Sequence, residues 1–371
     1  MSLVKNTNCE STIDALGSTA FEAVAIEVAH ALNARFYTDD EWLRHEQKYV
    51  FGACWQLAAH ASDLLAVGDH VVCDIAGKSV LIVRDENGEL RAFHNVCRHR
   101  AGPLALCNGK NAKALHCKYH GWTYGLDGQL RSAPEMHEAQ DFVVADIRLN
   151  QVRVHEWQGL VFVALSEHAP DFVEVFSGIA ERIHPLDLGT LQFARRVSYD
   201  MDCNWKVYVD NFLEGYHLPH VHPSLNRMLD YRAYTTELST WHSLQYSPLR
   251  NPDGIYADGD AFYYFLYPNI MLNIMPGRMQ TNRVIALGTD RCRVEFDYYY
   301  APVDDMQNRA QKDLQFSDEV QHEDIAICEA VQRGLSSGSY AAGRLCPKRE
   351  SGVWHFQNLL RGAYRNGLSN V

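Results

Sequence analysis

Short runs of alternating hydrophobic and polar residues fill the first half of the chain, and they predict antiparallel strands. Several runs meet at residue pairs that favour tight turns, namely Asn87-Gly88, Asp127-Gly128 and Gln158-Gly159. A helical pattern over roughly 39–50 precedes them, and Thr38 and Glu41 have the spacing of a capping box. Residues 40–166 are therefore predicted to form one all-antiparallel β domain.

The second half of the chain mixes helical and strand-like patterns. Helical patterns cover 172–184 and roughly 304–334, and long strand-like stretches cover 193–211, 259–275 and 279–302. This mixture predicts a second domain of α+β architecture over 167–371. Residues 1–39 are interpreted as an N-terminal segment that packs on this second domain.

Composition narrows the class of protein. The 371 residues leave room for two domains, and 47% hydrophobic with 22% charged residues is ordinary for a globular chain. The net charge of −12 argues against broad contact with nucleic acid or an anionic membrane. A membrane-spanning run and a signal-peptide pattern are both missing from the sequence. Ten cysteines scattered over the whole length indicate a reduced, cytoplasmic protein rather than a disulfide framework.

Two cysteine–histidine pairs lie in predicted loops of the first domain, Cys97-x-His99 and Cys117-x-x-His120. Zinc binds two cysteines and two histidines tetrahedrally, typically with two or more residues between paired ligands. A Rieske [2Fe-2S] cluster also takes two cysteines and two histidines, with the two histidines on one iron. That arrangement needs one cysteine and one histidine from each of two facing loops, which these pairs supply. The sequence favours the cluster and keeps zinc as the alternative.

The second domain carries three histidines close together, at His217, His220 and His222. Mononuclear iron that must bind oxygen prefers two histidines and one carboxylate on one face. A helical turn that ends at Pro219 would let His217 and either of the other two point to one ion. The helical stretch near residue 320 offers the carboxylates of Asp318, Glu319, Glu323, Asp324 and Glu329. Spacing alone does not choose the third ligand among them.

Taken together, these motifs resemble a known family. The two Cys–His pairs, followed by NWK…DNFLEGYH…H and EDIAICEAVQRGL, resemble the terminal oxygenase (α) subunits of Rieske non-heme iron ring-hydroxylating systems. The resemblance covers the chain from about residue 40 to its end. Within that family, FLYPNIMLN and CEAVQRGLSSGSYAAGR are similar to stretches of the choline and carnitine monooxygenases, which oxidise trimethylammonium compounds. The resemblance implies an all-β Rieske domain and a catalytic domain of helix-grip type.

The resemblance also implies roles for individual residues. The implied cluster ligands are Cys97, His99, Cys117 and His120, and the implied iron ligands are His217, His222 and Asp324. Glu214 stands three residues before the first iron histidine, where the family has a carboxylate that bridges one subunit's cluster histidine to a neighbour's iron histidine. Such a bridge implies a ring of subunits, most simply a homotrimer.

The resemblance implies hydroxylation of a C–H bond in a small organic substrate, and it favours a quaternary ammonium compound of the carnitine, choline or betaine type. The resemblance implies O₂ as cosubstrate and electrons from a separate NAD(P)H-dependent reductase, with or without a ferredoxin. An aromatic-ring dioxygenase is the alternative activity, and a Rieske electron-transfer protein is the alternative outside enzymes. The aromatic residues of 262–267 would suit a cage for a cation or the core of a buried strand.

Overall fold

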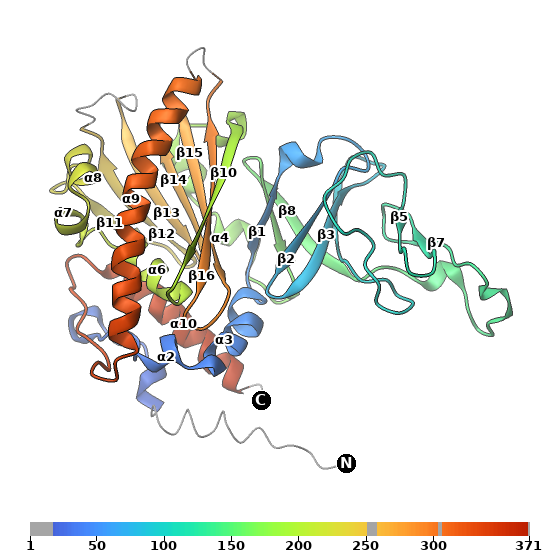
Figure 1. The fold of residues 1–371 in the computed structure, drawn as a ribbon, viewed down its shortest axis with the longest axis horizontal. Helices are drawn as coiled ribbons and strands as arrows, with labels where there is room; N and C mark the ends of the chain where they lie inside the picture. The colour runs from blue at the N-terminus through green and yellow to red at the C-terminus, as the bar shows by residue number, and fades with distance from the viewer. Residues whose placement is uncertain (1–17, 251–257, 303–305, 370–371) are drawn as a thin grey trace. The chain divides into compact units, whose positions relative to one another are not determined.

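The computed structural model describes residues 18–250, 258–302 and 306–369, which divide into two compact units (Figure 1). The β unit is Phe51–Phe172, and the α+β unit joins the described residues up to Val50 to those from Val173 onward. This division supports the predicted α+β class with an all-β first domain.

The boundaries between the units lie later in the chain than the predicted 39/40 and 166/167. The helical stretch that follows residue 39 stays with the α+β unit, where it buries Trp42 and Glu46. Residues up to Phe172 stay with the β unit, because the Trp55 indole N–H donates to the Pro170 carbonyl (2.9 Å) and the Trp55 ring packs on Phe172.

The N-terminal segment is described from Ser18, and residues 1–17 of the predicted segment 1–39 lie outside the described residues. The Leu32 N–H donates to Gln357 Oε1 (2.8 Å), and Arg361 donates to the Ala20 carbonyl. Both partners belong to the C-terminal helix, so the described part of this segment packs on the α+β unit.

The β unit contains two antiparallel sheets, with strand orders β1-β9-β8-β4-β3-β2 and β5-β6-β7. The strands are β1 (Gln56–His60), β2 (His70–Ile75), β3 (Lys78–Arg84), β4 (Leu90–His94), β5 (Leu115–His116), β6 (Thr123–Tyr124), β7 (Leu130–Ser132), β8 (Gln151–Trp157) and β9 (Leu160–Ala164), with short helices η4 (Ala61–Leu64), η5 (Met136–Glu138) and η6 (Val144–Asp146). The three predicted turns connect β3 to β4, β6 to β7 and β8 to β9, so those predictions are confirmed.

The α+β unit is built on one seven-stranded antiparallel sheet, in the order β10-β16-β15-β14-β13-β12-β11. Its strands are β10 (Gln192–Met201), β11 (Thr235–Leu238), β12 (His242–Pro248), β13 (Asp260–Leu266), β14 (Ile270–Met275), β15 (Arg278–Ala286) and β16 (Cys292–Tyr300). Its helices are η1 (Ser18–Phe21), η2 (Ile26–Val28), α2 (Arg35–Thr38), α3 (Asp40–Glu46), η3 (Gln47–Phe51), α4 (Phe172–Val175), α5 (Ile179–Ile183), η7 (Leu188–Thr190), α6 (Trp205–Phe212), α7 (Leu218–Val221), α8 (Pro223–Met228), α9 (Met306–Leu335) and α10 (Ser351–Ser369).

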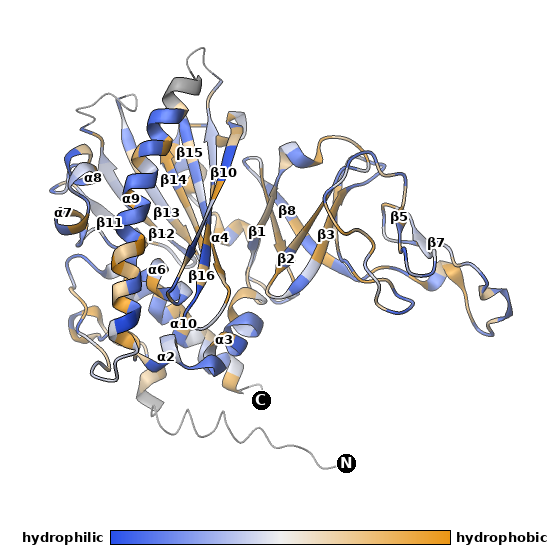
Figure 2. Ribbon diagram, viewed as in Figure 1, coloured by the Kyte–Doolittle hydropathy of each residue, from blue (hydrophilic) through white to orange (hydrophobic). Residues whose placement is uncertain are grey.

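Helix α9 runs across one face of the seven-stranded sheet, and hydrophilic and hydrophobic segments alternate along it (Figures 1 and 2). Its buried face is unusually polar, because Asp313, Gln321 and Gln332 are each at most 5% exposed, while Ile327 is 37% exposed. Buried polar groups require hydrogen-bond partners, so this face must meet polar groups of the sheet. Among the described residues, no helix has the length and apolar character needed to cross a membrane.

Two local predictions are wrong. The strand predicted over 193–211 ends at Met201, and α6 follows, because the Asn204 side chain caps the helix by accepting the Lys206 N–H (3.0 Å). The capping box before α3 does not form: the Thr38 hydroxyl donates back to the Ala34 carbonyl (3.2 Å), although the predicted helix is present.

An ion pair without solvent access ties three helices of the α+β unit together. Lys206 Nζ lies 2.6 Å from Glu46 Oε1, and both side chains are 0% exposed. The same carboxylate accepts the Trp205 indole N–H and the Tyr364 hydroxyl, each at 2.6 Å. Because α3, α6 and α10 supply these groups, the pair fixes the first turn of α6, the helix that precedes the histidine cluster.

We expect Lys206→Met to lower the free energy of unfolding by about 3–5 kcal/mol, because it leaves a buried carboxylate without its counter-charge. The double variant Glu46→Gln with Lys206→Met should recover part of that loss, since the neutral amide still accepts a hydrogen bond. Chemical denaturation measures both values. An unfolding free energy unchanged in Lys206→Met would show that the pair does not anchor α6.

Asp210 on α6 is another buried carboxyl, and it predicts that the stability of the fold depends on pH. Burial raises the pKa of Asp210 to about 7 from its ordinary 3.8, although the Tyr37 hydroxyl and Gln357 amide donate to it. Between pH 3.8 and about pH 7 the folded state therefore keeps the Asp210 proton, whereas the unfolded state loses it. The free energy of unfolding falls as pH rises through this range. Asp210→Asn should flatten that fall in denaturation curves measured between these pH values. Asp202→Asn, at an exposed position, is the control and should leave the slope unchanged.

Candidate metal centres

Two loops of the β unit repeat one backbone pattern around their cysteines. The Cys97 N–H donates to the Gly102 carbonyl (2.8 Å), and the Ala101 N–H donates back to the Cys97 carbonyl (3.1 Å). Around Cys117 the pattern is the same. The Cys117 N–H donates to the Trp122 carbonyl (2.9 Å), and the Gly121 N–H donates back to the Cys117 carbonyl (3.0 Å). Ala101 and Gly121 both have positive φ, at 59° and 73°. The unequal spacings, Cys-x-His and Cys-x-x-His, thus sit on equivalent turns.

These turns bring the four predicted cluster ligands together. Cys97 and Cys117 are 3% and 2% exposed, whereas His99 and His120 are exposed, with ring centroids 4.7 Å apart. The Tyr124 hydroxyl lies 3.3 Å from Cys97 Sγ and accepts a backbone N–H of the first loop. The sulfur side of the site is therefore enclosed, and the imidazole side faces outward.

The environment of these ligands fits a metal cluster. Burial raises the pKa of the Cys117 thiol, so a thiolate there needs a nearby positive charge. Desolvation lowers the pKa of His120, which keeps the imidazole in its neutral, metal-binding form. A single tetrahedral zinc ion would hold its ligand atoms about 3.3–3.8 Å apart, given bonds of about 2.0–2.3 Å. Within the described part of the chain, no three of these four ligands have donor atoms that all lie within 4.8 Å of one another.

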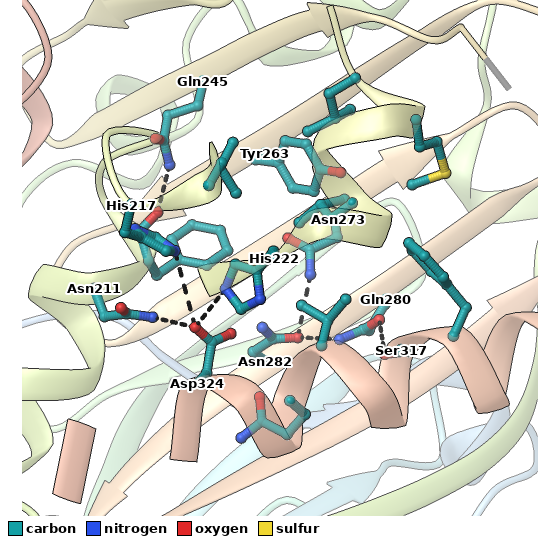
Figure 3. A pocket seen from close by; sticks show the side chains of 18 of the residues that line it. Asn211, His217, His222, Gln245, Tyr263, Asn273, Gln280, Asn282, Ser317 and Asp324 are labelled. Carbon is teal, nitrogen blue, oxygen red and sulfur yellow. Dashed lines mark hydrogen bonds and ion pairs between the residues drawn. The ribbon is translucent and has the colours of Figure 1, made fainter. Parts of the chain in front are cut away.

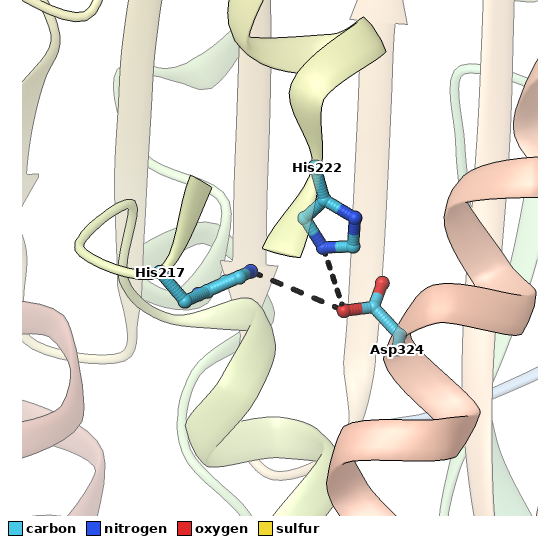
Figure 4. A group of neighbouring side chains, drawn as sticks. All are labelled: His217, His222 and Asp324. Atoms are coloured by element: carbon cyan, nitrogen blue, oxygen red, sulfur yellow. Dashed lines mark hydrogen bonds and ion pairs between the residues drawn. The ribbon is translucent and has the colours of Figure 1, made fainter. Parts of the chain in front are cut away.

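A different set of three residues in the α+β unit meets that limit: His217, His222 and Asp324 (Figure 4). Asp324 Oδ1 lies 2.9 Å from His222 Nε2 and 3.9 Å from His217 Nε2. His222 is 1% exposed, while His217 and Asp324 are 17% and 14% exposed. Two imidazole nitrogens and one carboxylate oxygen facing one point are the donor set of mononuclear non-heme iron.

Short helices present the two histidines. His217 precedes α7, and His222 lies between α7 and α8. The prediction that Pro219 ends a turn is wrong, because Pro219 lies in the first turn of α7, where its missing N–H removes no helical hydrogen bond. Asp324 comes from the polar, buried face of α9.

A carboxylate stands behind each histidine. His217 Nδ1 lies 2.6 Å from Glu214 Oε1, and His222 Nδ1 lies 2.6 Å from Glu323 Oε2. Each contact directs the Nε2 atom of its ring toward Asp324. Carboxylates that accept from the other ring nitrogen orient metal-ligating histidines in this way. The Asn211 amide in turn donates to Asp324 Oδ1 (2.6 Å). Sequence reasoning considered Glu323 only as a third iron ligand, since spacing gave no signal for this supporting position.

The remaining candidates lie elsewhere. His220 is exposed and outside the set of three. The other candidate acidic residues of α9 are engaged away from the site: Asp318 with the Tyr199 hydroxyl, Glu319 with the Ser224 hydroxyl and Glu329 with the Asp202 N–H.

Within the site, burial lowers the pKa of His222, but Asp324 and Glu323 raise it by more, so its pKa is raised overall. A metal cation would take the place of that attracted proton.

A cavity of about 110 Å³ opens beside the three residues (Figure 3). Its aromatic lining is Tyr208, Phe212, Tyr234, Tyr263, Phe296 and Phe316. Of the aromatic run 262–267, only Tyr263 lines the cavity. Alternation places Phe262 and Tyr264 on the other face of β13, and Phe265 and Tyr267 pack on Phe356 of α10. The alternative of a buried strand therefore holds for most of the run.

Comparison with known proteins gives two family matches. Residues 54–152 match the Rieske [2Fe-2S] domain, and residues 188–366 match the ring-hydroxylating α subunit, catalytic domain. Choline monooxygenase of Beta vulgaris is 34% identical over 95% of this chain and 81% of its own length. The carnitine monooxygenase oxygenase subunit of Escherichia coli K12 is 30% identical over 91% of this chain and 95% of its own.

Solved structures agree with these matches. The quaternary ammonium Rieske monooxygenase CntA in complex with L-carnitine is 27% identical, with a TM-score of 0.80 over 92% of this chain and 99% of that chain. Naphthalene 1,2-dioxygenase from Rhodococcus sp. is 19% identical with a TM-score of 0.76 over 98% of both chains, a likeness of fold alone.

The separation of the two centres predicts distinct effects of ligand variants. His217→Ala with His222→Ala should remove one iron per chain and leave the visible absorbance of the cluster, because the cysteine loops belong to the other unit. Cys97→Ser should abolish that absorbance. Iron quantitation beside the visible spectrum measures both. Full iron content in the double histidine variant would contradict the assignment of the second centre.

Proposed function

The chain belongs to the Rieske oxygenases, as an α subunit with a Rieske domain and a catalytic domain, and from that membership we propose that it hydroxylates a trimethylammonium compound. The observation that carries the proposal is the aromatic cavity beside His217, His222 and Asp324. Aromatic faces attract a quaternary ammonium ion, each by about 0.5–2 kcal/mol. The relatives choline monooxygenase and carnitine monooxygenase are named for two such compounds.

We assign the metal ligands as the sequence resemblance implies them. The cluster ligands are Cys97, His99, Cys117 and His120, and the iron ligands are His217, His222 and Asp324. When bound, the iron supplies oxygen activation with electrons delivered by the cluster. The protein's own contribution is orientation: Glu214 and Glu323 fix the two rings, and Asn211 holds the carboxylate of the third ligand.

Glu214 is proposed to carry electrons between subunits. Its Oε1 accepts from His217 Nδ1, and its Oε2 accepts the backbone N–H groups of Tyr216 and His217. A carboxylate oxygen has a second lone pair, so Oε1 retains one acceptor site for an exposed cluster imidazole of a neighbouring subunit. The outward-facing His99 and His120 support this docking. A homotrimer is the simplest ring that repeats it, and the CntA structure was described in terms of inter-subunit electron transfer.

The proposed oxygenase reaction also implies an electron-donating partner, a cosubstrate and a cellular compartment. Electrons must come from outside the chain, so we propose a separate NAD(P)H-dependent reductase, with or without a ferredoxin, and O₂ as cosubstrate. Disulfide bonds are absent among the described cysteines, which supports a reducing compartment such as the cytoplasm. The alternative of a simple electron-transfer protein leaves the second donor set without a use.

A substrate panel tests the proposed activity. Holoenzyme with an NADH-dependent reductase of a related Rieske system should oxidise at least one of choline, carnitine and glycine betaine, with O₂ consumption matched to product. A simple aromatic acid should give no product. Product from the aromatic acid alone would instead support the ring-hydroxylating alternative.

The bridging role predicts a selective defect. Glu214→Gln should keep three irons per chain yet slow the substrate-dependent reoxidation of the reduced cluster, because the amide cannot accept from both imidazoles in the same geometry. Glu323→Gln is the matched control, since it alters the equivalent contact on His222 without a place in the proposed bridge. Stopped-flow absorbance measures the reoxidation. Equal rates in the two variants would reject the bridge.

A further inference from the structure

A row of polar side chains crosses the sheet beneath the cavity. The row consists of Gln245, Tyr263, Asn273, Gln280 and Tyr298, which are directly paired neighbours on β12, β13, β14, β15 and β16. Paired residues on antiparallel strands project to the same face, so the five stand side by side. The first four line the cavity (Figure 3).

The outer members of the row are satisfied by the protein. Gln245 donates to the Phe212 carbonyl (2.5 Å) and accepts the Tyr234 hydroxyl (3.0 Å). Gln280 accepts the Ser317 hydroxyl (3.2 Å), which also pairs with the Tyr298 hydroxyl (2.9 Å). These contacts close both ends of the row.

The two middle members are not satisfied. The Tyr263 hydroxyl and Asn273 Oδ1 are buried and have no hydrogen-bond partner, and Asn273 is 8% exposed. Other buried polar atoms also lack partners, but of these residues only Tyr263 and Asn273 line the cavity within the described chain. A buried polar group without a partner is costly, so a ligand group that pairs with both atoms would be favoured.

The orientation of the Asn273 amide is set by a chain of donors. Arg278 has only N–H groups, so Gln280 must present its oxygen to it (2.5 Å) and its Nε2 to Asn282 Oδ1 (2.8 Å). Asn282 Oδ1 therefore accepts, and the Asn273 Nδ2 points to it at 3.5 Å. Asn273 Oδ1 is left facing the cavity as an acceptor that needs a donor.

The cavity has no spare positive charge for an anion. Arg278 is the one lysine or arginine among the lining residues that the structure describes, and its Nε lies 2.6 Å from Asp313 Oδ2. The two side chains are 5% and 3% exposed, so the guanidinium is already neutralised in a dry environment. A carboxylate at this end would meet a paired arginine and the lone pairs of Asn273 Oδ1.

We infer that Tyr263 and Asn273 bind the polar end of the substrate and that this end is a neutral hydroxyl group. The substrate O–H donates to Asn273 Oδ1, and its oxygen accepts from the Tyr263 O–H. The favoured substrate is then a quaternary amino alcohol rather than a betaine carboxylate. This inference rests on the proposed trimethylammonium oxygenase and names the class of compound within it.

Binding to oxygen-free, oxidised holoenzyme, measured by isothermal titration calorimetry, tests the inference without turnover. The probes are choline, n-propyltrimethylammonium, in which a methyl group replaces the hydroxyl, and glycine betaine. Choline should bind about tenfold more tightly than either of the others, as expected for one buried hydroxyl pairing. Tyr263→Phe should weaken choline binding by about the same factor and leave n-propyltrimethylammonium binding unchanged.

Tyr264→Phe is the matched control, because Tyr264 is the next residue on β13, is buried and does not line the cavity. It should leave all three affinities unchanged. Glycine betaine binding as tightly as choline, or an equal effect of Tyr263→Phe on choline and its methyl analogue, would overturn the hydroxyl assignment alone. Failure of all three trimethylammonium compounds to bind would overturn the proposed function as well.

Discussion

The buried pair of Glu46 and Lys206 is the constraint on which the catalytic side of the molecule depends. Lys206 lies in the first turn of α6, and the same helix carries Asn211, whose amide donates a hydrogen bond to Asp324 Oδ1. The loop after α6 then supplies Glu214 and His217, and His222 follows between α7 and α8. A charge pair with no exposed surface tolerates little displacement, because either partner alone would be a desolvated ion. The position of the donor set therefore derives from a contact far from it in sequence.

The same logic of obligatory donors and acceptors operates within the site. Glu214 and Glu323 can only accept while ionised, so each fixes the tautomer of its histidine. Arg278 can only donate, and it fixes the successive amides of Gln280 and Asn282. The proposed metal donors and substrate acceptors are thus oriented before either ligand arrives, which is the preorganisation that binding sites need.

Local signals predicted much of this arrangement. Turn pairs such as Asn87-Gly88 were predictable because these residues favour the backbone conformation of a tight turn. The Cys–His pairs were predictable because the ligand residues of each pair lie close together in sequence. The helix Trp205–Phe212 was missed because its aromatic and β-branched residues favour a strand locally, whereas the buried Lys206 and the Asn204 cap decide for a helix. The role of Glu323 depends on a tertiary contact that no short-range pattern contains. Helix α10 does have a local signal, because the apolar Val353, Phe356, Leu360 and Tyr364 recur at helical spacing.

Exposure separates the two halves of the proposed cluster site, and this difference suits the electron transfer between subunits that we propose. The buried cysteines are shielded from water by Tyr124 and neighbouring core residues. The exposed imidazoles of His99 and His120 are the parts of the site that another surface can reach. Glu214, the proposed acceptor, is 13% exposed and already oriented by its own chain. In the proposed docking a neighbouring imidazole would therefore meet a fixed acceptor, and the His99 ring is itself held by stacking on Trp122.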